Sequence, residues 1–267
     1  LGQPGPGRGD HRRRIVSGSP DVVLAVFHWV EYLGLLGAIG TIVVRRLARN
    51  RPPIAWAQHP PMHLALGLAF LGGLAVVTIE GIDAGALPGW ERLARVAAEG
   101  LAFVFCIRQF GFPVPLALLA AALLSVAGHA TLYQQPGAVF VDLVHVFSAG
   151  LWAGGILALA TLRPPDGWRS RDARALLDRF GGVALIAFAV TALTGVIRAS
   201  DQLHDVSGLW TTAYGEVLGL KSIGVAVMLV LSAVAWRRRI PFARAEAAVA
   251  VLVIGATAVL AAFPAPH

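Results

Sequence analysis

Four histidines have positions in the sequence that would bring their imidazoles to one end of a helical bundle. Two lie roughly two turns into an apolar segment, one lies near the end of such a segment and one lies in a polar loop. The two within apolar segments are His28 and His145, the one near a segment end is His129, and the one in the polar loop is His204. An ionisable side chain is costly in hydrocarbon and tends to face a bundle interior with a partner. Four imidazoles at similar depth therefore predict a metal site.

Acidic and basic residues accompany these histidines. Residues three apart share a face of a helix, and two acid–histidine pairs have this spacing, His28 with Glu31 and Asp142 with His145. A carboxylate on that face can orient an imidazole and fix the tautomer that binds metal. We therefore expect a supporting shell around the ligands, made of Glu31, Asp142, Asp201, Asp205 and Lys221.

Each histidine taken alone has a simpler explanation. A single histidine in a membrane helix usually bonds a neighbouring helix, which suits His28 and His129. A solvated loop position explains His204 as well as ligation does. His145 favours a functional role, and the metal hypothesis depends on the four together.

The ligand types narrow the choice of metal. Thioether or thiolate binding of Cu(I) needs several Met or Cys, and the chain has two Met and one Cys, Cys106. Imidazole ligands suit Cu(II), mixed-valence copper, zinc or haem. The sequence has no HExxH motif and no Gly-rich phosphate loop, so zinc protease and ATP-driven pump functions lack support.

The elements that must position these residues are membrane-spanning helices. Of the 267 residues, 57% are hydrophobic and 14% charged, far from the averages of soluble proteins. A spanning helix needs roughly 20 mainly apolar residues. The pattern predicts an all-α polytopic membrane bundle of about eight helices over residues 21–267, after a flexible extracytoplasmic tail or linker at 1–20. The spans are expected near 21–44, 62–81, 96–112, 114–132, 138–161, 181–199, 216–236 and 245–263. The third is the weakest, and its helix could begin earlier, near Trp90.

Arginine sets the expected orientation. In an eight-helix threading, most arginines fall in turns on one side, which the positive-inside rule makes cytoplasmic. This places both termini outside the cytoplasm. Arg92, Arg95 and Arg198 lie near helix ends on the opposite side, and the arginines of the tail favour the reverse orientation. The net charge of +7 is explained by these turns, so we do not expect nucleic-acid binding.

A faint internal repeat supports an even number of helices. HWVEYLGLLGAIG in the first span and HVFSAGLWAGGIL in the fifth share a His and a Gly nine residues later. This predicts a four-plus-four repeat. The GLWAGG stretch at 150–155 is expected to pack helices closely through small residues, with Trp152 filling space.

Several motifs carry a resemblance to a known family. These are GHA at 128–130, VHVFSAGLWAGG at 144–155, RFGGVALIAFAVTALTGVIRA at 179–199 and TTAYGEVLGLKSIGVAVML at 211–229. The chain resembles CopD-type copper-resistance membrane proteins, well over roughly 125–263 and more loosely over 21–124. The motif positions are His129, His145, Trp152, Gly154, Gly155, Tyr214, Gly215 and Lys221. Glu216 departs from the pattern, since the family often has a basic residue there.

The resemblance implies an eight-helix protein of the bacterial inner membrane, associated with copper uptake or resistance and working beside or fused to a periplasmic CopC-type domain. The leading interpretation is a copper-handling protein that binds the ion at the outer end of the bundle and is not an enzyme. One alternative is a b-type cytochrome that carries electrons, with His129 and His145 as axial haem ligands. A second alternative is a structural or assembly subunit.

Overall fold

The structure, a computed structural model, describes residues 20–84, 89–127, 136–202, 210, 212–238 and 243–263. This part of the chain is helical and has no strand. The elements are α1 (Val22–Arg49), η1 (Ala55–Ala57), α2 (Met62–Ala84), α3 (Trp90–Ile107), α4 (Pro113–Ala127), α5 (Pro136–Ala149), η2 (Gly150–Gly154), α6 (Gly155–Thr161), α7 (Arg171–Gln202), α9 (Ala213–Arg238) and α10 (Ala243–Ala261). The predicted tail lies outside the described residues, apart from Pro20.

The predicted all-α bundle is confirmed. Because α5, η2 and α6 follow one another without a break, the described helices form eight rods, one for each predicted span. Six helices are long and apolar enough to cross a membrane, and α4 is a shorter apolar helix. The weak third span begins at Trp90, and its charged residues explain why α3 reads poorly as a spanning segment.

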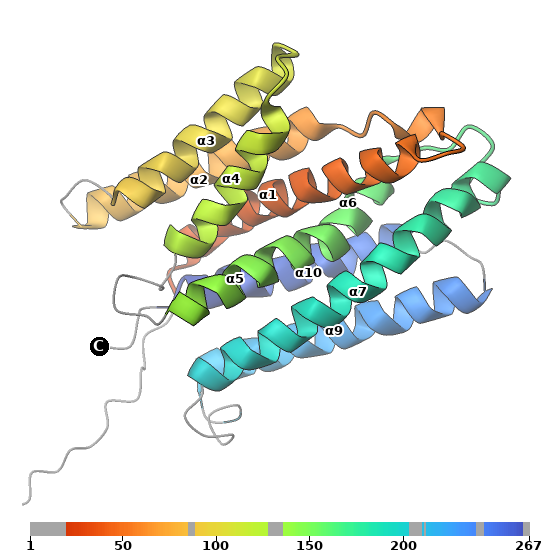
Figure 1. Cartoon of the computed structure of the whole chain (residues 1–267). Coiled ribbons are helices and arrows are strands. Elements are labelled where there is room, and N and C mark those ends of the chain that lie inside the picture. Colours follow the sequence, from red (N-terminus) through yellow and green to blue (C-terminus); the bar gives the residue numbers. More distant parts are fainter. Residues whose placement is uncertain are drawn as a thin grey trace, which may run out of the picture.

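The rods alternate in direction, so their connections gather at two ends (Figure 1). α1, α5 and α10 lie in the middle, with α2 to α4 on one side and α7 and α9 on the other. At one end the amide of Asp21 donates to the carbonyl of Ala262 at 3.2 Å, which joins the start of α1 to the end of α10.

The opposite end carries basic residues. The guanidinium of Arg179, near the start of α7, donates to the carbonyls of Leu47, Asn50 and Pro52 at 3.0–3.2 Å. These bonds tie α7 to the end of α1, where Arg46 and Arg49 lie. A basic end of this kind is what the positive-inside rule associates with the cytoplasm.

The GLWAGG stretch packs as expected. A Cβ built on Gly154 would collide with the carbonyl of Leu36, and one built on Gly40 would collide with the backbone of Gly154, so α1 and η2 touch backbone to backbone. Trp152 is buried and its ring lies 4.9 Å from that of Phe188 in an edge-on contact. Small residues thus bring the two halves of the chain together at their centre.

Gly154→Ala should therefore lower the free energy of unfolding in detergent by about 1–3 kcal/mol or more, the cost of overpacking a tight contact. Gly181→Ala is the matched control, because a Cβ on Gly181 meets nothing within 4 Å and Ala favours a helix by ~1 kcal/mol over Gly. Equal unfolding midpoints for the two variants would contradict the backbone contact.

Candidate functional site

Four ionisable residues form a buried group between α1 and α3, which we call the charged cluster: His28, Glu31, Arg95 and Glu99. The guanidinium Nε of Arg95 lies 3.0 Å from Oε1 of Glu31, and Nδ1 of His28 lies 3.4 Å from Oε2 of the same carboxylate. The two distances are within the range of ion pairs, but the donor and acceptor atoms are not aligned as in a hydrogen bond. The i, i+3 spacing of His28 and Glu31 in the sequence thus corresponds to a contact between their side chains.

Two glycines of α2 make room for this cluster. A Cβ on Gly72 would collide with the backbone of Glu31, so α2 packs directly on α1. A Cβ on Gly73 would collide with Oε2 of Glu99 and lie 3.2 Å from Oε1 of Glu31. The two carboxyl groups therefore share the space that a side chain at Gly73 would fill.

A second polar group lies between α5 and α7, and we call it the His145 cluster: His145, Ser148, Thr191 and Thr194. Nδ1 of His145 is 2.9 Å from the hydroxyl oxygen of Thr194. That hydroxyl donates its proton to the carbonyl of Val190 at 2.7 Å, so it accepts from Nδ1–H of the imidazole. The network thus assigns the tautomer in which Nε2 keeps its lone pair, the state that a metal ligand requires.

Two further bonds hold the helices around this imidazole. The hydroxyl of Thr191 donates to that of Ser148 at 2.9 Å, and Ser148 donates to the carbonyl of His145 at 3.1 Å. Two residues after Ser148, α5 passes into η2, a five-residue π-helix at Gly150–Gly154. Single π-helical turns often occur at functional sites, because they change the direction in which nearby side chains point.

Charged residues lie toward the end of the bundle where α5 begins. The guanidinium of Arg198 is 2.8 Å from Oδ2 of Asp142 in a partly exposed ion pair. Arg198 and Lys221 are the cations that act on the imidazole of His145. Asp142 therefore offsets part of the positive charge beside His145, on the face of α5 that the sequence predicted.

The predicted four-histidine site is only partly within the described residues. His129, His204 and Asp205 lie outside them, as does the side chain of Asp201. His28 and His145 belong to different clusters. Within the described ranges there is no group of three or more His, Cys, Asp or Glu that could hold a metal ion. Joint ligation by these histidines stays a prediction.

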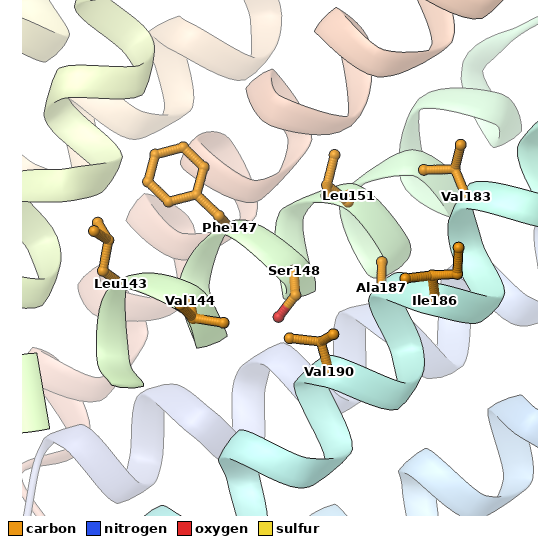
Figure 2. A pocket seen from close by; sticks show the side chains of 9 residues that line it. All are labelled: Leu143, Val144, Phe147, Ser148, Leu151, Val183, Ile186, Ala187 and Val190. Carbon is orange, nitrogen blue, oxygen red and sulfur yellow. The ribbon is translucent and has the colours of Figure 1, made fainter. Parts of the chain in front are cut away.

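An apolar groove of about 460 Å³ lies beside the His145 cluster. Figure 2 shows that side chains of α5 and η2 line one wall and side chains of α7 the other, with the hydroxyl of Ser148 as the polar group among them. Its apolar walls suit lipid contact more than ion binding.

The sequence interpretation missed part of both clusters. It named neither Arg95 nor Glu99 among the expected site residues. The spacing of Arg92, Arg95 and Glu99, at i, i+3 and i+7, was a signal for one charged face of a helix. Thr191 and Thr194 are three residues apart and also share a helix face, but two threonines in an apolar segment give little reason to expect a site.

These features define a polytopic helical membrane protein with two polar clusters inside its bundle. Residues 174–261 match the family model described as "Copper resistance protein D" (CopD). The chain is also 33% identical over 173 residues to the copper transport protein CutJ of Bacillus subtilis (strain 168), a match that covers 59% of this chain and 32% of that protein. The predicted resemblance to CopD-type membrane proteins is confirmed. The chain spans about a third of the length of that relative, and no solved structure matches it.

The two arginine pairs of α3 allow a test of the charged cluster. Arg95→Met should destabilise the protein by about 3–5 kcal/mol, because it leaves the buried carboxylate of Glu31 without its cation. Arg92→Met removes the partner of Glu80, a partly exposed pair at 3.1 Å, and should cost about 0–1 kcal/mol. Denaturant unfolding in detergent measures both, and equal losses would show that the Arg95 pair is not buried as described.

Proposed function

We propose that this chain is a copper-handling membrane protein, which binds the ion with His145 and with His129 and His204 of the neighbouring segments. One observation carries the proposal. The segment that matches the CopD family supplies the residues that surround His145, namely Thr191, Thr194, Arg198 and Lys221. The names of the family and of the relative are the reason for proposing copper as the ion. The hydrogen bonds of His145 support this choice, because they favour the tautomer in which Nε2 carries the lone pair that a metal ligand needs.

The ligand set is centred on His145 for a physical reason. Its imidazole is fixed by Thr194 on a helix that Ser148 and Thr191 tie to α7, so the ligand is held before the ion arrives. A rigid ligand loses little entropy on binding. His28 is left out of the proposed set because its Nδ1 already faces Glu31 in the charged cluster. The acid Asp142 offsets Arg198, which would otherwise repel a cation.

Analysis of one preparation of purified protein distinguishes this proposal from the two alternatives, a haem-binding cytochrome and a structural subunit. Copper retained in about stoichiometric amount, without a Soret absorption band, is expected for the copper site. A Soret band would favour a haem-binding cytochrome. Protein with neither metal nor haem, even after incubation with copper, would favour a structural subunit.

His145→Ala should remove most copper affinity, because it deletes a fixed ligand. Asp142→Asn should weaken binding about 10-fold to 100-fold, the usual effect of losing a carboxylate that supports a ligand. Lys221→Met should do less. Acidification should also release copper from the parent, because a protonated imidazole cannot ligate.

Equilibrium copper titration of the purified variants measures these effects. If His145→Ala binds copper like the parent while Asp142→Asn or Lys221→Met abolishes binding, the imidazole is not the centre of the site. The acids Asp201 and Asp205 would then be better candidates.

We also propose that the protein lies in the bacterial inner membrane with both termini outside the cytoplasm. The Arg179 contacts support this, since they gather the basic ends of α1 and α7 on one side. The first reporter is a phosphatase that is active only after export, and it should be active when fused after His267. The second is a fluorescent protein that folds only in the cytoplasm, and it should not fluoresce when fused at the same position. The reverse pair of results would contradict the eight-helix orientation.

A further inference from the structure

One face of α3 carries a line of charged side chains that runs from its first turn into the bundle. The residues are Arg92, Arg95 and Glu99, at spacings of three and four. The exposed fraction of the side chain falls along this line, from 35% for Arg92 to 4% for Arg95, and Glu99 is fully buried. The line thus connects an accessible end of the bundle with its interior.

Each arginine of this line already has a carboxylate partner from another helix. Arg92 lies 3.1 Å from Oε2 of Glu80 on α2, and Arg95 lies 3.0 Å from Oε1 of Glu31 on α1. Glu99 has no arginine of its own: Arg95 pairs with Glu31, and both oxygens of Glu99 are buried without a hydrogen bond. If Glu99 were ionised as well as Glu31, the two carboxylates would share the single positive charge of Arg95, and the remaining negative charge in hydrocarbon would be strongly unfavourable.

The position of Glu99 beside Glu31 adds to this cost. Both carboxyl groups border the space above Gly73, and they are near enough for a hydrogen bond if one of them carries a proton. Two ionised carboxylates at this separation repel one another, whereas one neutral acid can donate to the other. Glu31 is the member held by Arg95 and His28, so Glu99 is the member that takes the proton.

We propose that Glu99 is a proton-binding site, at which a neutral carboxylic acid donates a hydrogen bond to Glu31 and exchanges its proton with water at the end of the bundle where α3 begins. The proton moves to and from a carboxyl oxygen, and no other bond changes. The site is separate from the proposed copper site and does not depend on it.

A proton fits this place better than a metal ion does. Arg95 stands next to the two carboxyl groups and would repel a metal cation, and the collision of a Cβ at Gly73 with Glu99 shows how little space is present. The described residues also hold no group with the ligand number of a metal site. A proton needs only one oxygen and a nearby acceptor.

The groups that face Glu99 come from every helix around it. α1 supplies Glu31, with His28 behind it, α2 supplies Gly73, and α3 supplies Arg95 one turn earlier. The described residues of α4, Pro113–Ala127, contain no titratable side chain. Carboxylic acids in such surroundings are typical of proton relays in membrane transport proteins.

Infrared spectroscopy of the whole chain in lipid nanodiscs, without copper, tests the proposal. The parent should show the C=O stretching band of a neutral carboxylic acid at neutral pH, and the band should shift in D₂O because the proton exchanges. Glu99→Gln keeps the shape of the side chain and should remove the band. Glu80→Gln, at the partly exposed end of the line, is the control and should leave it unchanged.

Aspartate variants identify the residue that holds the proton. Glu99→Asp should move the band, since the acid occupies a new position, and Glu31→Asp should leave it nearly in place. A band that survives Glu99→Gln, fails to shift in D₂O, or moves only in Glu31→Asp would overturn the assignment. Absence of the band from the parent would overturn it as well.

Discussion

The interaction on which the first half of the bundle depends is the buried ion pair between Arg95 and Glu31. A lone charge in hydrocarbon costs several kcal/mol, so α1 and α3 can carry these residues only if the two helices stay together. The pair does not balance the cluster, because Glu99 adds a second acid to one arginine. Because the acids outnumber the arginine, one of the two carboxyl groups is favoured to carry a proton. Helix packing alone does not require these charged side chains.

Small residues make this arrangement sterically accessible. Gly72 and Gly73 let α2 lie against Glu31 and Glu99, as Gly40 and Gly154 let α1 touch η2. Helices in a bilayer gain little from hydrophobic burial and associate through close packing and polar contacts. The same glycines therefore allow close packing of the helices and also polar contacts between them, because close backbones bring polar side chains of different helices within bonding distance.

The sequence predicted the helices well and the site only in part. Long apolar runs such as 216–236 show a spanning helix directly, since hydrocarbon thickness determines their length. The pairing of His28 with Glu31 also followed from local spacing. Contacts between helices, such as Arg95 with Glu31 or His145 with Thr194, depend on rotation and packing that one sequence does not encode locally. His129 and His204 lie outside the described residues, and the four-histidine site remains a prediction.

α1 links the two polar clusters physically. Glu31 reaches α3, while the indole of Trp29, two residues earlier, donates to the carbonyl of Val251 on α10 at 2.9 Å. Further along the same helix, Gly34 packs on α2, and Gly40 packs on η2 in the rod that carries His145. A helix held on opposite sides within so few residues cannot rotate to suit one cluster without disturbing the other. α1 is therefore the element that the two clusters share, because it carries Glu31 of the charged cluster and packs on the rod that carries His145.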